Sequence, residues 1–242
     1  MTKRFFTTIA AAAAMFAAVA QAQADGYRVH GSATVGKGII APNKAKIESS
    51  FGKQLSVVMN GSGNGLKDLA AGRADIAMIS ADLGFEVRKS GAQGDFKPVA
   101  IGSKKISFVV HPSNPVSSLT AEQVKGILSG EINDWSQVGG KAGPILVVAE
   151  VDGQGTRASV EIGALGGKPI TKKARTFKAL IQVAKVVSQA PNAFGYANGS
   201  SMIPGVKVID GVQADQPLSL VTIGAPNADQ KKFIDAVKAL GE

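Results

Sequence analysis

The sequence predicts an α/β protein in which parallel sheets carry helices on both faces. Apolar strands alternate with amphipathic helices along the chain, which is the pattern of such sheets. Three times, a strand runs into a turn of glycine and hydroxyl residues that opens a helix. Removal of a signal peptide from the 242 residues leaves enough length for one large or two small domains with a hydrophobic core.

Residues 1–24 have the three parts of a secretory signal peptide. Lys3 and Arg4 form a basic start, and residues 5–20 form an apolar core too short to span a bilayer well. Ala20-Gln21-Ala22 or Ala22-Gln23-Ala24 supplies the small-residue cleavage site; an uncleaved membrane anchor is the alternative. The chain has no cysteine, so neither a lipid-anchoring cysteine nor a disulfide is expected. We expect a free protein of the periplasm.

The charge of the chain suits an anionic ligand. The formal net charge is +9, and cleavage would remove two of these positive charges; the remainder could equally serve solubility. Apart from phenylalanine, the aromatic residues are Tyr27, Trp135 and Tyr196, too few to form a platform for stacking bases or sugars. We therefore expect no nucleic acid partner.

The first half of the mature chain repeats one unit. Residues 27–51 predict a short strand to His30, a Gly-Ser-Ala-Thr turn and a helix toward Phe51. Residues 54–80 predict a strand, a glycine turn, a helix ended by Gly72 and a further strand.

The second half contains the same unit once more. Residues 104–118 predict an apolar strand ended by two prolines, and residues 119–130 a helix with a capping box of Thr120 and Gln123. Residues 143–165 predict a third strand, glycine turn and helix, and Asn227 caps a C-terminal helix. The proline-rich segment 111–115 and the loop 188–201 are the expected places where the chain changes domain.

The three turns are Gly31–Thr34, Gly61–Gly65 and Gly153–Arg157. Each places unpaired N–H groups and the positive end of a helix dipole at the carboxyl edge of a strand, where open α/β sheets bind ligands. The hydroxyl groups of these turns can donate further hydrogen bonds; they belong to Ser32, Thr34, Ser62 and Thr156. One such turn is typical of an ordinary helix cap, whereas three favour an oxyanion shared between two lobes.

Nucleotide motifs are incomplete. Residues 153–158 fit the dinucleotide pattern G-x-G-x-x-A, but the chain has no acidic residue between Ile162 and Ile209 to bind the ribose. Residues 61–67 lack the G-K-[ST] ending of a phosphate loop.

Catalytic and metal motifs are missing as well. His30 and His111 are the only histidines, and the chain has no G-x-S-x-G elbow. Two histidines without cysteines make a poor transition-metal site. We expect no enzyme activity, no catalytic residue, no metal and no cofactor.

Six segments follow one another in a familiar order. They are HGSATVGKGI, NGSGNGLKDLAAGRADIAMIS, VVHPSNP, LTAEQVKGILSGEINDWSQVGG, GQGTR and NAFGY. Together they resemble the periplasmic phosphate-binding protein family of the high-affinity phosphate ABC transporter, over essentially the whole mature chain. The resemblance implies a type II periplasmic-binding-protein fold, with two α/β lobes joined by a two-strand hinge. It places residues 25–112 and 197–242 in lobe I and residues 113–196 in lobe II.

The resemblance also implies that the three turns bind the anion. The implied ligand-binding residues are Ser32, Ala33, Thr34, Ser62, Gly63, Ser80, Gly153, Gln154, Gly155, Thr156 and Arg157. The implied partners are a small oxyanion, with phosphate first, and the membrane subunits of an ABC transporter, and the protein is expected to act as a monomer.

This chain departs from the family pattern in the site itself. Glu150 and Gln154 occupy positions where the family commonly has Arg and Ser, so Arg157 becomes the charged candidate for contact with the ligand. Ser80 is followed by Ala81, where the family usually has Asp or Arg, and Asp82 lies one place further. Asp82 either replaces the family's proton acceptor and favours a protonated ligand, or points away; the gap-free match of residues 76–80 favours the second arrangement.

The function expected from the sequence is capture of phosphate or a similar small oxyanion by hinge closure, for delivery to an ABC transporter. Two alternatives remain. In the first, the same scaffold binds another small molecule or acts as a sensor. In the second, the chain is an extracellular interaction protein that has lost the anion site.

Overall fold

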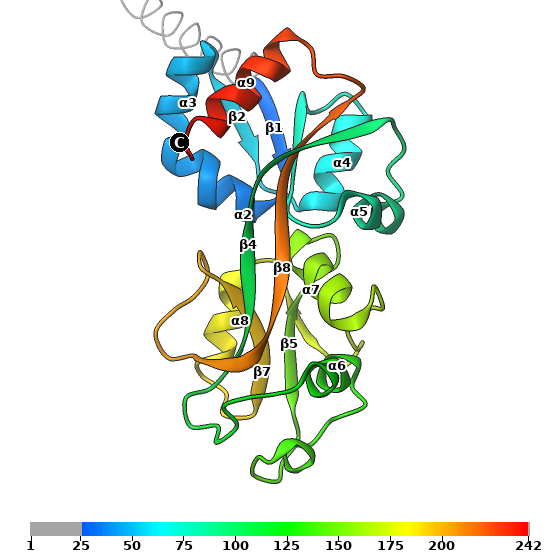
Figure 1. The fold of residues 1–242 in the computed structure, drawn as a ribbon, viewed down its shortest axis with the longest axis vertical. Coiled ribbons are helices and arrows are strands. Elements are labelled where there is room, and N and C mark those ends of the chain that lie inside the picture. The colour runs from blue at the N-terminus through cyan, green and yellow to red at the C-terminus, as the bar shows by residue number, and fades with distance from the viewer. Residues whose placement is uncertain (1–25, 242) are drawn as a thin grey trace, which may run out of the picture.

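A computed structural model describes residues 26–241, which form two lobes stacked along the long axis of the molecule (Figure 1). The predicted signal peptide, residues 1–24, lies outside the described residues. The segments β4 (Phe96–Val110) and β8 (Lys207–Ile223) run through both lobes and join them.

Within the described residues, one sheet has the strand order β2-β1-β3-β8-β4-β7-β5-β6. The lobe I strands are β1 (Tyr27–Gly31), β2 (Leu55–Val58) and β3 (Ile76–Ile79). The lobe II strands are β5 (Leu146–Glu150), β6 (Arg175–Phe177) and β7 (Ala193–Asn198). β1 pairs in parallel with β2 and β3, and β5 pairs in parallel with β6 and β7. The parallel arrangement expected from the sequence is therefore present within each lobe.

The two long strands are antiparallel to their neighbours. β8 pairs with β3 and β4, and β4 also pairs with β7, so the parallel sets of the two lobes are joined through an antiparallel centre. β8 was not expected from the sequence, because residues 207–217 mix polar and apolar side chains with Gly211 and Pro217 and lack the apolar run of a buried strand.

Helices flank the sheet in both lobes (Figure 1). Lobe I carries α2 (Ala33–Val35), a π-helical turn (Gly36–Ile40), a 3₁₀ turn (Ala41–Asn43), α3 (Lys44–Phe51), α4 (Ser62–Ala70), α5 (Leu83–Ser90) and α9 (Ala228–Lys238). Lobe II carries α6 (Ala121–Ser129), a 3₁₀ turn (Trp135–Val138), α7 (Gly155–Leu165) and α8 (Leu180–Val187).

The predicted helix caps are confirmed. Gln123 N donates to Thr120 Oγ1 at 3.2 Å, and Thr120 N donates to Gln123 Oε1 at 2.9 Å, which closes the capping box of α6. Asn227 caps α9 in the same way with Gln230, at 2.9 Å in both directions. Local sequence was sufficient here, because both partners lie within one helical turn.

Each lobe has its own hydrophobic core, and the cores locate the crossing between the lobes. Val99 and Ile101 of β4 pack with the lobe I core, whereas Ile106 packs with the lobe II core. On β8, Ala214 belongs to lobe II and Leu218 to lobe I. The chain thus changes lobe inside the two long strands.

This position differs from the predicted boundaries at residues 112/113 and 196/197. The prolines after β4 end the strand inside lobe II, so they do not mark the hinge. The segment 188–201, expected to be a connecting loop, contains the buried strand β7. Its residues Ala-Phe-Gly-Tyr-Ala-Asn face two layers and therefore show no polar alternation.

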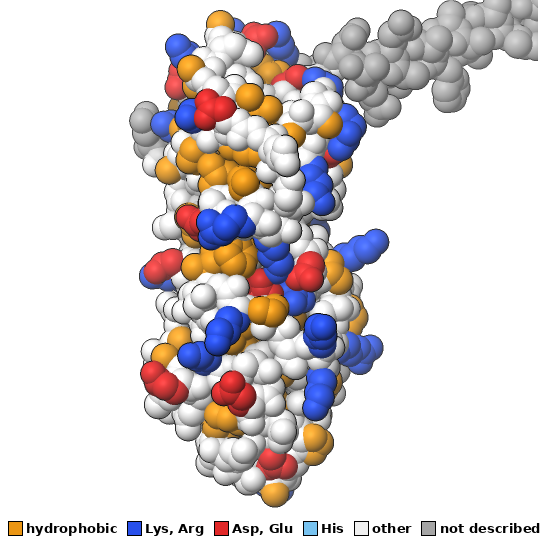
Figure 2. Space-filling view, turned by 90° about the vertical axis from the view of Figure 1, so that its right-hand side faces the viewer, with side chains coloured by type: hydrophobic (Ala, Val, Ile, Leu, Met, Phe, Trp, Pro, Cys, Tyr) orange, Lys and Arg blue, Asp and Glu red, His pale blue; other side chains and the backbone are white. Residues whose placement is uncertain are grey.

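Basic side chains are spread over both lobes on the face shown in Figure 2, with acidic ones between them. The positive charge of the chain is thus not gathered into one patch on this face. In residues 26–241, the structure contains no helix with the length and apolarity that a membrane crossing requires.

Candidate functional site

A cavity of about 400 Å³ lies between the lobes, at the carboxyl ends of strands from both. Lobe I contributes the residues after β1, β2 and β3, and lobe II those after β5, β6 and β7. The lining residues are Ser32, Ala33, Thr34, Lys37, Met59, Ser80, Glu150, Gln154, Gly155, Thr156, Lys178, Ala179, Leu180, Ile181, Ser200 and Ser201. Seven of the predicted ligand-binding residues are in this set: Ser32, Ala33, Thr34, Ser80, Gln154, Gly155 and Thr156.

The first turn forms a hydroxyl network with the end of β3. Ser32 caps α2, where its Oγ accepts hydrogen bonds from the N–H groups of Thr34 and Val35 at 3.1 and 3.3 Å. Its hydroxyl proton is donated to Ser80 Oγ at 2.8 Å. The Ser80 hydroxyl is thereby left with its own proton to offer to a ligand.

The two lobes meet directly at the cavity. Thr34 Oγ1 of lobe I lies 3.2 Å from Thr156 Oγ1 of lobe II, within hydrogen-bond distance. Gln216, on the crossing strand β8, donates to Thr156 Oγ1 at 2.8 Å and accepts from Asn198 Nδ2 at 2.9 Å. These buried groups hold the Thr156 hydroxyl in place from the hinge side.

The second turn lies behind the cavity wall. α4 begins at Ser62, so most of the predicted glycine turn is helix. Ser62 Oγ accepts from Ser80 N at 3.2 Å, and Gly63 N donates to the Gly153 carbonyl oxygen at 3.4 Å. The amide and hydroxyl expected to bind a ligand therefore bind the protein's own backbone.

The glycines of this turn permit close contact between backbones. Gly61 has a φ of +97°, a conformation that side chains disfavour. A Cβ on Gly65 would lie 2.6 Å from Gly31 Cα and 2.9 Å from the His30 carbonyl oxygen. Packing of α4 against β1 thus explains these residues without a ligand.

The third turn lines the cavity only in part. Gln154, Gly155 and Thr156 face it, whereas Gly153 is not among the lining residues. A Cβ on Gly155 would lie 2.3 Å from both Ser62 Oγ and Ser80 Oγ, so the contact between the lobes requires glycine at this position. Ser159 Oγ donates to the Ser80 carbonyl oxygen at 3.0 Å across the same interface.

Arg157 does not line the cavity, contrary to expectation. Its Nε lies 2.8 Å from Glu161 Oε1 and 3.0 Å from Asp152 Oδ1, and its Nη1 donates to the Glu150 carbonyl oxygen at 2.8 Å. Arg157 is 7% exposed, and Glu161 is 1% exposed. The guanidinium therefore neutralises a buried carboxylate and fixes the first turn of α7.

Glu150 is the unexpected group of the site. It ends β5, lines the cavity and is 4% exposed. Its backbone N–H donates to the Tyr196 hydroxyl at 2.9 Å. Among residues 26–241, its Oε2 has no hydrogen-bond partner. Burial raises the pKa of the Glu150 carboxyl to about 8, against the opposing effects of the Thr156 hydroxyl and of the N–H and charge of Arg157.

Asp82 lies outside the cavity lining. It is exposed and caps α5, where its Oδ1 accepts from Phe85 N at 2.8 Å. Ala81, which precedes it, is buried. This placement corresponds to the gap-free arrangement, in which the side chain of Asp82 points away.

The residues that β2, β6 and the segment after β7 contribute to the cavity wall were not expected from the sequence. Lys178 follows β6, a strand of three residues, and Ser200 and Ser201 follow β7, which was expected to be loop. Among residues 26–241, the cations that line the cavity are Lys37 and Lys178, both exposed. The signal that could have found these residues is their position just after a strand, once the strands themselves are known.

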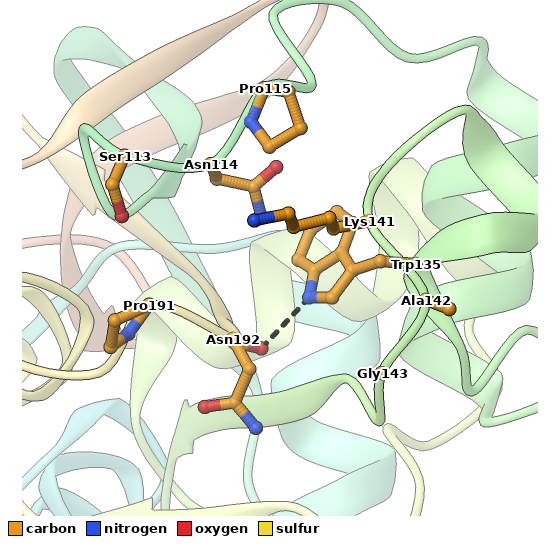
Figure 3. Close-up of a pocket in the computed structure, with 9 residues that line it drawn as sticks. All are labelled: Ser113, Asn114, Pro115, Trp135, Lys141, Ala142, Gly143, Pro191 and Asn192. Carbon is orange, nitrogen blue, oxygen red and sulfur yellow. Dashed lines mark hydrogen bonds between the residues drawn. The ribbon is translucent and has the colours of Figure 1, made fainter.

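A second cavity, of about 320 Å³, lies in lobe II near the amino ends of β5 and β7 (Figure 3). The Trp135 indole N–H donates to the Asn192 carbonyl oxygen at 3.1 Å there, beside Asn114 and Lys141. Its lining includes none of the predicted site residues. Because the cleft between the lobes lies at the carboxyl ends of the strands, this cavity lies at the opposite end of the lobe II strands.

The chain is similar to known phosphate-binding proteins. The phosphate-binding protein PstS of Bacillus subtilis is 27% identical over 172 residues, which are 69% of this chain. The match spans 55% of the length of that relative.

Two solved structures are similar over most of their length. One, from Clostridium perfringens, is assigned as the substrate-binding protein of a phosphate ABC transporter and contains bound phosphate; it is 28% identical with a TM-score of 0.74, covering 87% of this chain and 91% of its own. The other is an ABC-type phosphate transport receptor from Vibrio cholerae, 26% identical with a TM-score of 0.71, covering 87% and 93%. The family resemblance and the type II periplasmic-binding-protein fold predicted from the sequence are confirmed. A model of the PBP superfamily domain matches residues 15–238, and this chain therefore belongs to the PBP superfamily.

Proposed function

We propose that this chain is an exported solute-binding protein that captures phosphate or a similar small oxyanion between its lobes and delivers it to an ABC transporter. The observation that carries the proposal is the cavity in which Ser32, Thr34, Ser80 and Thr156 meet from both lobes. Hydroxyl groups fixed by the protein are suited to an anion, because they need no reorganisation when it binds. The similarity to phosphate-binding proteins supports the same ligand class.

The mechanism that we propose is binding without chemistry. β4 and β8 form the connection about which the lobes can open and close, and the Thr34–Thr156 contact belongs to the closed form. Similarity to transporter substrate-binding proteins supports membrane transport subunits as partners and an extracytoplasmic location.

Glu150 favours a second candidate, a small ligand that carries less negative charge. An ionised carboxylate beside an oxyanion is unfavourable in a buried site. The same scaffold could then bind a neutral or weakly acidic molecule.

Calorimetry on residues 25–242 with phosphate, sulfate, nucleotides and small neutral and acidic organic molecules tests the proposal. We expect one oxyanion to bind with a stoichiometry of one. Ser80→Ala should weaken that binding at least tenfold, about 1.4 kcal/mol, because a hydroxyl donor is lost. Ser113→Ala, a hydroxyl of the second cavity, is the matched control and should leave affinity unchanged. Equal affinities of both variants, or binding of an organic molecule alone, would contradict the oxyanion proposal.

A further inference from the structure

Glu150 lines the cavity and is 4% exposed, and residues of three elements lie around it. β5 places it there, β7 contributes Tyr196 beside its N–H, and α7 contributes Thr156 and Arg157. The other charged groups of this region are Glu161 and Asp152, which are paired with Arg157 and Lys89, and the lining residues Lys37 and Lys178.

The carboxyl has bonding capacity that the protein leaves unused. Its Oε2 is buried and has no hydrogen-bond partner in residues 26–241, although buried polar atoms nearly always have one. Arg157 is a cation whose charge acts on this carboxyl, but its guanidinium contacts Glu161, Asp152 and the Glu150 carbonyl oxygen. An ionised Glu150 would thus lie in the wall without a salt bridge to its side chain.

A carboxylic acid solves this problem and is also compatible with an anion. The neutral acid has one O–H donor, which the carboxyl can offer to a ligand oxygen. A negative ligand in the cavity would further favour the protonated form, since two negative charges cannot be close neighbours in a buried site.

We propose that Glu150 binds the ligand as a neutral carboxylic acid, and that it donates a hydrogen bond to an oxyanion which needs no proton of its own. This inference rests on the proposed function. It assigns the ligand class as tetrahedral oxyanions in general, sulfate as well as phosphate, because the proton shared at the site is supplied by the protein. Burial, which raises the pKa of the carboxyl to about 8, is consistent with this role.

The inference predicts a loss of discrimination. A site that requires a hydrogen on its ligand rejects the analogue lacking it by a factor on the order of 10⁴. Here we expect phosphate and sulfate to bind with dissociation constants within about tenfold of each other at pH 6.5. Phosphate binding with sulfate rejected by a factor above 10³ would overturn the inference and leave the proposed function standing.

The inference also predicts a pH profile. Sulfate does not titrate between pH 6 and 9.5, so any change in its affinity reports on the protein. The dissociation constant should be flat at pH 6–7 and rise about tenfold per pH unit above pH 8, because the free protein must regain a proton to bind. Calorimetry of the wild-type protein in two buffers of different ionisation enthalpy should show uptake of about one proton per sulfate at pH 9.

Two variants assign the slope to this carboxyl. Glu150→Gln keeps an N–H donor but cannot titrate, so its sulfate affinity should not change with pH. Glu86→Gln removes the matched carboxyl, 1% exposed and with a pKa raised by burial to about 7, which does not line the cavity; it should keep the wild-type slope. A flat wild-type profile without proton uptake, or a slope that survives Glu150→Gln, would overturn the inference. Absence of phosphate and sulfate binding at every pH would overturn the proposed function as well.

Discussion

Two neighbouring residues, Glu150 and Arg157, have roles that their type alone does not predict. Arg157 looks like an anion ligand, because it stands in the first turn of a helix. In the folded protein it pairs with Glu161, which is 1% exposed, because a buried carboxylate is costly without cationic partners. Glu150 looks unsuited to an anion site, but burial raises the pKa of its carboxyl and so favours the neutral acid.

At the residue scale, Arg157→Met should destabilise the protein more than it weakens binding. We expect the free energy of unfolding in urea to fall by about 3 kcal/mol, because Glu161 and the Glu150 carbonyl group lose a buried partner. Oxyanion affinity of the folded variant should fall less than tenfold. The double variant Arg157→Met, Glu161→Gln should recover part of the stability. A large loss of affinity at unchanged stability would show that Arg157 contacts the ligand.

At the scale of elements, glycines decide how closely the pieces around the cleft approach one another. Gly65 sets the distance between α4 and β1, and Gly155 sets the distance between α7 and the end of β3. These contacts position Ser32 and Ser80 on one side of the cavity and Thr156 on the other. Small residues at helix starts thus have a packing role here, in addition to any role in ligand binding.

Gly65→Ala tests this packing role. The new methyl group would meet the backbone of Gly31 and His30, which can move only with β1, so we expect a loss of about 2 kcal/mol or more in urea unfolding. The matched control is Gly84→Ala in α5, where the nearest atoms are side-chain ends at 3.3 Å. That variant should be neutral or gain up to ~1 kcal/mol from helix propensity. Equal effects of the two substitutions would contradict the packing role.

At the scale of the whole molecule, an ionic contact joins the lobes away from the cavity. Lys89 of α5, in lobe I, lies 2.9 Å from Asp152 Oδ1 and also pairs with Glu161 of α7, in lobe II. The lobes are therefore connected by this contact, by the Thr34–Thr156 contact and by the strands β4 and β8. An interaction that exists only in the closed form raises the population of that form. It therefore also raises the apparent affinity of a ligand that binds the closed form.

Lys89→Met should weaken oxyanion binding although Lys89 does not line the cavity. We expect a dissociation constant five- to tenfold higher, about 1–1.4 kcal/mol, because the closed form loses a partly buried ion pair. Small-angle scattering of the ligand-free variant should show a larger radius of gyration. Lys97→Met, which removes the exposed pair with Asp95 within lobe I, is the control and should change neither quantity. If both variants bind like the wild type, the contact does not favour closure.

The sequence by itself determined the features that depend on neighbouring residues. The parallel α/β units, the caps at Thr120 and Asn227 and the hydroxyl groups after β1 and β5 were all predictable, because their partners lie within a few residues. The resemblance to a known family extended this to the two lobes.

Tertiary structure decided the rest, because it depends on contacts between distant residues. Ser62 and Gly63 carry the expected chemistry, but they are bonded to Ser80 and Gly153, which follow the strands β3 and β5, and do not line the cavity. The crossing strand β8 mixes polar and apolar residues in its first half and is held by pairing with β3 and β4. The raised pKa of Glu150 follows from burial of its side chain by residues that are distant in the sequence.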